Sequence, residues 1–291
     1  MTTVLVTGAT GHVGYQLATR LHEDGWKVRA VVRSPGQFDL VNAQGWEPVL
    51  GDLAQPQSLK VPLEEGDFVL HCAAYAGADK PLYQTVNVEA TRRLADLALH
   101  AKVRRFVHIS TISVHGNELP SRVDEESPLA TTDPEPYCSS KALGELALGE
   151  IRAHGLETVV LRPGMITNVV RSQWGNEMVE RIRTKGWPKS FHPDDVQPWV
   201  QTLNLAEMSR LALTHPEAAN ETFLAVDRNV ALREFYGPIA DALGQPVLVP
   251  DRAPQLSTCH VGKISTKLGY KPVRSFEETM DGLVALAKTP H

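Results

Sequence analysis

The sequence has few cysteines and no long apolar run. Its three cysteines, Cys72, Cys138 and Cys259, are odd in number and lack the spacing of metal ligands. We therefore expect free thiols in a reducing compartment, and no metal site. No run reaches the roughly 18 apolar residues of a membrane-spanning helix, and the N-terminus does not resemble a secretion signal. These absences predict a cytoplasmic protein with no membrane partner.

The sequence also lacks an excess of positive charge. Its formal net charge is −5 at pH 7, and its lysines and arginines form no block or stripe. This pattern argues against nucleic acid or an anionic membrane as the main partner. The partner that remains is a small molecule.

The first 165 residues alternate short apolar runs with helical patterns. Between the first two runs, Val13, Leu17 and Leu21 lie four residues apart, as on one face of a helix. Strands that alternate with helices predict an α/β fold with a doubly wound parallel sheet. The six predicted strands are residues 3–7, 27–32, 47–50, 68–72, 105–110 and 158–162.

The pattern changes after residue 165. Several tryptophans, prolines and glycines interrupt residues 166–200, with one helical run at 176–184. A helical pattern at 204–213 and an apolar run at 222–226 then return to the regular alternation. We expect a sheet domain formed by residues 1–165 and 201–227. Residues 166–200 and 228–291 are expected to form a smaller, C-terminal substrate-binding lobe.

A glycine-rich loop lies between the first strand and the first helix. Glycines there let the backbone approach a pyrophosphate, and the helix offers its free N–H groups to the phosphate charge. Three glycines also suit a structural turn, but the strand–loop–helix context favours a dinucleotide. The expected cofactor-binding residues of this loop are Gly8, Thr10, Gly11, His12, Val13 and Gly14.

The end of the second strand indicates which dinucleotide binds. A carboxylate there would bind the ribose 2′-hydroxyl of NAD, whereas an arginine suits the 2′-phosphate of NADP. The sequence has Arg33 followed by Ser34, with no aspartate before Asp39. We therefore predict NADP, with NAD as the alternative. Arg33 as an ordinary solvated charge is the competing interpretation.

Tyr137 and Lys141 are spaced so that a helix would place both on one face. A free phenol titrates near ~10, and a neighbouring lysine and a positive nicotinamide would both lower that pKa. Tyr137 is therefore the predicted general acid and base. A chance pair on a surface helix is the alternative.

The ordered set of motifs resembles the extended short-chain dehydrogenase/reductase superfamily, also described as the NAD-dependent epimerase/dehydratase family. The spacing Thr-Gly-x-x-Gly-x-x-Gly, the segment 109–116, the Tyr-x-x-x-Lys pair and the tail 268–272 carry the resemblance. Residues 28–33 look most like dihydroflavonol reductases and 3β-hydroxysteroid dehydrogenases. Many members dimerise, so a homodimer is one expectation.

The resemblance assigns roles to further residues. It implies that Thr111 polarises the carbonyl oxygen, with Ser113 as its rival for that role. It also implies that Asn87 orders a water that relays protons to Lys141; the alternative is an ordinary helix asparagine. It places Pro163 at a turn beside the nicotinamide. The remaining cofactor-binding residues that it implies are Asp52, Leu53, Ala73, Ala74 and Ser110, together with Tyr137 and Lys141.

Members of this superfamily catalyse several reactions. Where nucleotide-sugar enzymes carry an arginine that grips the diphosphate, this sequence has Gln197. The helix that follows has Asn204 in place of an aspartate, and Asn204 can still serve as its N-cap. Other arginines remain as candidates for a diphosphate grip: Arg171, Arg181 and Arg183. Four residues of the lobe suit either a site for an apolar carbonyl compound or the lobe core: Trp174, Met178, Trp187 and Trp199.

The leading hypothesis is an NADP(H)-dependent oxidoreductase that transfers a hydride between the nicotinamide and a ketone, an aldehyde or a secondary alcohol. The first alternative is a nucleotide-sugar epimerase or dehydratase with tightly bound NAD. The second is a non-catalytic protein that senses NADP.

Overall fold

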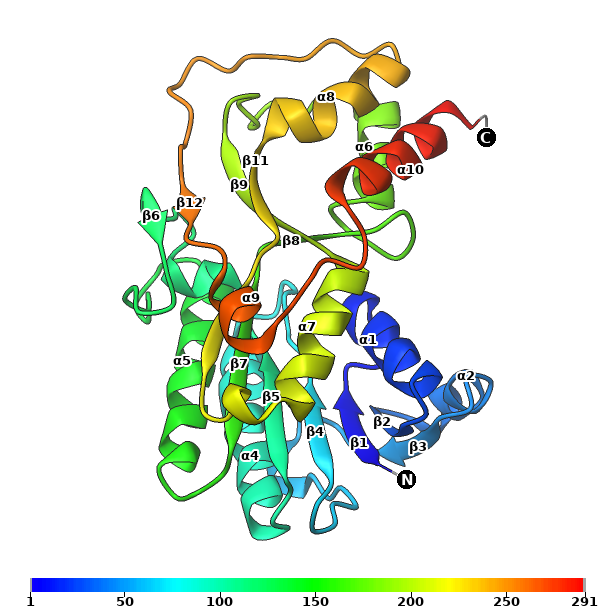
Figure 1. The fold of residues 1–291 in the computed structure, drawn as a ribbon, viewed down its shortest axis with the longest axis vertical. Helices are drawn as coiled ribbons and strands as arrows, with labels where there is room; N and C mark the ends of the chain where they lie inside the picture. The colour runs from blue at the N-terminus through cyan, green and yellow to red at the C-terminus, as the bar shows by residue number, and fades with distance from the viewer. Residues whose placement is uncertain (1, 290–291) are drawn as a thin grey trace.

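The computed structural model describes residues 2–289. Its centre is a seven-stranded parallel sheet with strand order β10-β7-β5-β4-β1-β2-β3 (Figure 1). This doubly wound α/β arrangement is the predicted fold class, and the predicted strands are confirmed with ends that differ by at most one residue. The strands are β1 (Thr3–Thr7), β2 (Lys27–Val32), β3 (Glu47–Leu50), β4 (Phe68–His71), β5 (Arg105–Ile109), β7 (Thr158–Pro163) and β10 (Thr222–Ala225).

Alternate residues of a strand point to opposite faces of the sheet. Apolar side chains lie on both faces here, and helices cover each face. Val4 and Val6 of β1 pack in one core with α1 (His12–Glu23) and α7 (Thr202–Thr214). Leu5 packs in the other core with α4 (Ala90–His100) and α5 (Pro136–Arg152). Both cores are apolar, as expected for a sheet buried on both sides.

A smaller lobe lies beyond the carboxyl ends of the strands (Figure 1). It contains a three-stranded sheet of β8 (Met165–Thr167), β9 (Val196–Gln201) and β11 (Arg228–Ala231). Three helices pack around one apolar core there: α6 (Asn176–Lys185), α8 (Leu232–Ala242) and α10 (Phe276–Lys288). Gly164 alone separates β7 from β8, and a Cβ at Gly164 would lie 2.3 Å from the carbonyl oxygen of Pro198.

Shorter elements connect these layers. Near the β3 edge of the sheet lie η1 (Pro35–Gln37), α2 (Phe38–Asn42) and η2 (Pro56–Ser58). The segment before α4 contains α3 (Lys80–Leu82) and the π-helix η3 (Tyr83–Glu89). The others are η4 (Ile112–His115), β6 (Arg122–Val123), η5 (Pro216–Ala218), β12 (Thr258–Cys259) and α9 (Lys263–Leu268).

Asn204 is not the N-cap of its helix, so that prediction is wrong. Helix α7 begins at Thr202, and the side chain of Gln201 accepts the hydrogen bond from the Leu203 N–H. The Asn204 amide is buried and donates instead to Asp227 Oδ2, at 2.7 Å. It thereby ties α7 to the segment that follows β10.

The aromatic residues of the lobe belong mainly to its core. Trp187, Trp199 and Met178 are at most 3% exposed and pack in the lobe core, with Trp174 against it. For the three buried side chains the structure therefore favours the core over the apolar substrate site. Burial of this kind stabilises the lobe rather than recognising a ligand.

Candidate active site

The glycine-rich loop runs from the end of β1 to the start of α1. Gly8 has a φ of +69°, and a Cβ there would lie 2.8 Å from the backbone nitrogen of Ala73. A Cβ at Gly14 would lie 2.3 Å from the carbonyl oxygen of Gly8. Gly11 caps α1 without a side-chain hydrogen bond. The loop therefore packs closely against the segment that follows β4 and leaves the N–H groups of α1 for an anion.

A cavity of about 550 Å³ lies against this loop, at the carboxyl ends of the central strands. Ligand-binding sites of parallel α/β sheets occur at this edge. Nearly all the predicted cofactor-binding residues line it: Gly8, Thr10, Gly11, His12, Val13, Gly14, Arg33, Asp52, Leu53, Ala73, Ala74, Ser110, Tyr137 and Lys141. Pro163 is not among its lining residues; it is buried in β7 and pairs with Ala225 of β10.

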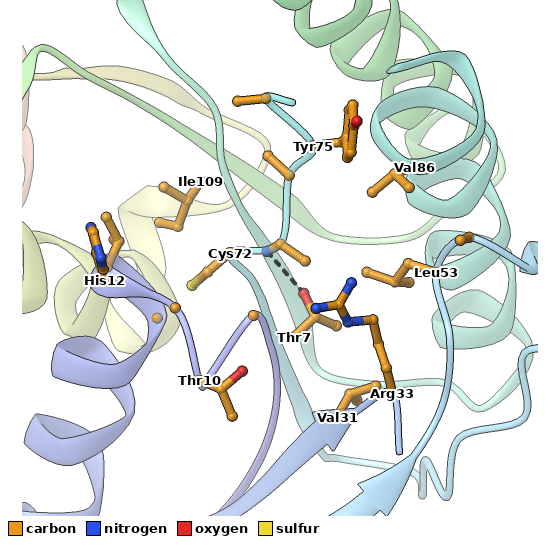
Figure 2. A pocket seen from close by; sticks show the side chains of 18 of the residues that line it. Thr7, Thr10, His12, Val31, Arg33, Leu53, Cys72, Tyr75, Val86 and Ile109 are labelled. Atoms are coloured by element: carbon orange, nitrogen blue, oxygen red, sulfur yellow. Dashed lines mark hydrogen bonds between the residues drawn. The ribbon is translucent and has the colours of Figure 1, made fainter. Parts of the chain in front are cut away.

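The cavity also has lining residues that the sequence did not reveal. They are Gln37, which accepts a hydrogen bond from the Arg33 N–H, and Gly51, Tyr75, Val86 and Ile166. Figure 2 shows the Arg33 side chain reaching into the cavity toward Thr7 and Leu53. The volume, the glycine cradle and the positive side chain fit a dinucleotide.

Tyr137 lies in the first turn of α5, where the Glu135 side chain accepts the hydrogen bond from its backbone N–H. Its phenol is hydrogen-bonded to the Thr111 side chain, so the structure brings these two predicted residues together. Burial raises the pKa of Tyr137, and the Thr111 hydrogen bond opposes that shift. Tyr137 is therefore a protonated donor at neutral pH. Its activation by Lys141 and a bound nicotinamide stays a prediction.

Lys141 is only 1% exposed, one turn further along α5. Its Nζ donates to the carbonyl oxygen of Ile109 at 3.0 Å and lies 3.1 Å from Nε2 of His108. Burial lowers the pKa of Lys141 to about 8, whereas the Glu145 carboxylate raises it. The amine therefore titrates close to neutral pH.

A buried ion pair lies behind Ser110. Arg162 of β7 donates to Glu145 Oε2 at 2.7 Å, and both side chains are almost fully buried. The Ser110 hydroxyl donates to the same carboxylate. Sequence reasoning missed Glu145 and Arg162, although Glu145 continues the four-residue spacing of Tyr137 and Lys141. The pair holds the end of β5, where Ser110 and Thr111 follow.

Asn87 is buried in η3 and does not line the cavity. Its Oδ1 accepts from the Tyr75 N–H at 2.7 Å, and its Nδ2 donates to the Tyr75 carbonyl and to Ser140 Oγ. These contacts tie the loop after β4 to α5. The proton relay through Asn87 stays a prediction.

Contacts from the lobe reach α1 directly. His12 Nε2 lies 3.4 Å from Glu177 Oε1, and the Arg171 guanidinium lies 3.9 Å from the centre of the Tyr15 ring. Arg183 donates to Glu180 and to the Leu286 carbonyl. Two of the three arginines suggested for a diphosphate grip are thus engaged by other groups.

Two kinds of site can be assessed for the described part of the chain. Residues 2–289 include no cluster of three or more His, Cys, Asp or Glu side chains placed to hold a metal ion. None of the helices within that range is long and apolar enough to cross a membrane.

Comparison with known proteins agrees with this site. The model of the NAD dependent epimerase/dehydratase family matches residues 4–224. The 4-hydroxy-2-methyl-3-oxo-4-farnesyl-3,4-dihydroquinoline-1-oxide ketoreductase of Stigmatella aurantiaca is 30% identical over 82% of this chain and 72% of its own. UDP-glucose 4-epimerase of Vibrio cholerae is 29% identical over 84% of this chain and 76% of its own.

A solved structure shares the fold. A short-chain dehydrogenase/reductase superfamily protein from Agrobacterium tumefaciens with bound NAD superposes with a TM-score of 0.79, at 24% identity, over 98% of this chain and 96% of that one. With the match of the family model, the chain belongs to the NAD dependent epimerase/dehydratase family of extended short-chain dehydrogenases/reductases, enzymes that act on CH–OH or C=O groups with a nicotinamide cofactor.

Proposed function

We propose that this protein is an NADP(H)-dependent oxidoreductase that reduces a ketone or aldehyde, or oxidises the corresponding secondary alcohol. The observation that carries the proposal is that Tyr137 and Lys141 line the cavity and that the Tyr137 phenol is hydrogen-bonded to the Thr111 side chain. These side chains provide a proton donor, a second hydroxyl for the same oxygen and a nearby cation. The other proposals below depend on this arrangement.

The chain's own residues would handle the proton and the charge of the reaction. When bound, the nicotinamide supplies or accepts the hydride. In the reductive direction the Tyr137 phenol donates its proton to the carbonyl oxygen, and the Thr111 hydroxyl donates a hydrogen bond to that oxygen. The Lys141 ammonium favours the phenolate that remains on Tyr137. In the oxidative direction Tyr137 accepts the proton of the alcohol.

The preference for NADP is attributed to Arg33. Its guanidinium lines the cavity and has no side-chain partner within residues 2–289, so it is available for a 2′-phosphate. We expect Arg33→Ala to weaken NADPH binding about 10- to 100-fold, the value of a hydrogen bond to a charged group, and to leave NADH binding unchanged. Isothermal titration with both nucleotides measures this.

The control for that substitution is Arg233→Ala. Arg233 is an exposed arginine of the lobe that pairs with Asp194, away from the cavity lining. It should leave both affinities unchanged. Equal loss of NADH and NADPH binding in Arg33→Ala would contradict the assignment.

The expected substrate is a neutral carbonyl compound rather than a nucleotide sugar. A diphosphate needs positive side chains, yet Arg171 stacks on Tyr15 and Arg183 binds Glu180 and Leu286. Gln197, at the position of the family's arginine, lies in β9 opposite Val230. Ile166 and Val86 supply apolar lining in the cavity that Tyr137 also lines. These features support a reductase similar to the ketoreductase relative.

The test is NADPH oxidation with a panel of aliphatic, aromatic and steroid-like ketones. We expect turnover with at least one member, and a fall of about 10²- to 10⁴-fold in Tyr137→Phe, because the general acid is lost. Three results together would instead establish the epimerase or dehydratase alternative. They are no turnover with any ketone, release of stoichiometric NAD on denaturation, and thermal stabilisation by UDP- or dTDP-sugars.

A further inference from the structure

The side chain that contacts Lys141 from the sheet is His108, in the fourth position of β5. Its side chain is fully buried, and its Nε2 lies 3.1 Å from the Lys141 Nζ. The Ile109 carbonyl, from the next residue, accepts a second hydrogen bond from the same amine at 3.0 Å. Two consecutive residues of β5 therefore hold the amine from one side.

The His108 ring is neutral. Burial lowers its pKa well below the usual value, and the charge of Lys141 lowers it further. A neutral ring can accept a hydrogen bond at Nε2 from the lysine ammonium, and Nδ1 then carries the hydrogen. That Nδ1 has no hydrogen-bond partner among residues 2–289. Lys141 is thus the one polar contact of this ring within the described chain.

A second histidine fixes the plane of the ring. His71 of β4 is the register partner of His108, and the two rings stack with centroids 5.1 Å apart. Both His71 nitrogens are engaged, with Thr7 Oγ1 at 2.6 Å and Thr91 Oγ1 at 2.9 Å. The His71 ring therefore cannot turn without breaking two buried hydrogen bonds. The His108 ring stacks on this fixed ring.

We propose that His108 is a positioning residue that orients the Lys141 amine toward the cavity. An ammonium group has three N–H donors. His108 and the Ile109 carbonyl occupy two of them, and tetrahedral geometry then fixes the direction of the third. This role rests on the proposed function, in which Lys141 acts on Tyr137 and the bound nucleotide.

The charged and titratable groups around the amine explain why an acceptor matters there. Glu145, on the same helix, favours the ammonium, while Cys72 and His71 approach from β4 and the segment after it. Tyr137 lies one turn earlier on α5. Burial works against the charge on Lys141, so loss of a hydrogen-bond acceptor removes part of what keeps the amine protonated.

The test compares His108→Phe with His108→Gln. Phenylalanine keeps a ring against His71 but has no acceptor, whereas glutamine retains an acceptor oxygen. In protein labelled with ¹³C,¹⁵N-lysine, the Lys141 signal is assigned by its loss in Lys141→Arg and followed against pH without nucleotide or substrate. We expect His108→Phe to move the midpoint about 1 to 2 pH units lower, and His108→Gln to stay near the wild-type value.

The kinetic readout is the pH profile of carbonyl reduction. The alkaline limb of kcat should move to lower pH in His108→Phe by the same amount, and return in His108→Gln. Thermal melts check folding, and His108→Met is a second variant without a nitrogen or oxygen acceptor. An unchanged Lys141 midpoint in a folded Phe or Met variant would overturn the proposal. The titration needs no substrate, so its result is independent of whether the proposed reaction is found.

Discussion

The nucleotide cavity and the lobe use their arginines in opposite ways. Arg33 reaches into the cavity without a side-chain partner in the described chain, whereas Arg252 and Arg233 of the lobe pair with Asp195 and Asp194. A free cation beside a cavity is available to a ligand, while a paired one holds its own fold together. Of these three arginines, Arg33 is therefore the one available to a ligand.

The aromatic residues show the same contrast. Trp199 of the lobe is fully buried, with its ring 5.0 Å from that of Phe276. Tyr75 and Tyr137 of the sheet domain line the cavity instead. The comparison teaches that an aromatic-rich segment in this sequence marks the core of the lobe, whereas the aromatic side chains that line the cavity come from the sheet domain.

Trp199→Ala should produce the largest effect, a loss of about 3–5 kcal/mol in the free energy of unfolding, as for other large buried aromatic residues. Urea unfolding measures it. Because Trp199 does not line the nucleotide cavity, the folded fraction should bind NADPH with wild-type affinity. A stable variant with weakened substrate binding would break the comparison, since the tryptophan would then belong to the site.

Gly14→Val should have the next largest effect, on the other half of the molecule. The new side chain would collide with the Gly8 carbonyl and force the loop away from the position that a pyrophosphate needs. We expect NADPH affinity to fall at least about 100-fold, or roughly 2.7 kcal/mol. Fluorescence titration of NADPH gives the affinity.

The matched control is Gly149→Ala, on the exposed side of α5. A Cβ there meets no atom within 4 Å, so the substitution should leave nucleotide binding intact. It should raise the free energy of unfolding by about 0.5–1 kcal/mol, because alanine loses less backbone entropy than glycine in a helix. If both glycine variants lost NADPH binding equally, the loss in Gly14→Val could not be assigned to the glycine-rich loop around Gly14.

The smallest expected effect concerns acid stability. Burial lowers the pKa of His71 to about 3 in the folded chain, while the unfolded value is near ~6.5. The unfolded state therefore binds more protons below that value, and stability falls as the pH drops from 6.5 toward 3. Over the first pH unit the loss from His71 should be about 1 kcal/mol.

Urea unfolding at pH 6.5 and 5.5 checks this, with His71→Gln as the variant that cannot titrate. Its stability should depend less on pH over that interval than that of the wild type. Equal slopes would mean that His71 is not the group responsible. Two other buried histidines, His108 and His115, would then be examined in the same way.

The local features of the site could be predicted from the sequence because each depends on residues that are close together in the chain. The glycine spacing fixes the loop, and the four-residue spacing fixes the shared face of Tyr137 and Lys141. The strands were recognised because apolar runs of this length are typical of buried parallel strands. Arg33 was found by its place after a predicted strand.

Contacts between distant segments could not be predicted. His108 meets Lys141 because β5 and α5 pack together, and Arg162 meets Glu145 for the same reason. No sequence pattern within β5 marks His108, and none within β7 marks Arg162, as a polar residue that is buried. Gln201 as the cap of α7 was not predicted, because glutamine is not a preferred N-cap residue. The tertiary contact of Asn204 with Asp227 places the Asn204 side chain elsewhere.

The tight turn at Gly164 sets a rule for recombining this protein with its relatives. The backbone of this residue lies so close to Pro198 that no side chain fits between them. A chimera that joins this sheet domain to a foreign lobe must therefore inherit both strands, β8 and β9, from one parent and keep a glycine at the crossover. Exchanges confined to the segments between β8 and β9, or after β11, leave the contact between Gly164 and Pro198 intact.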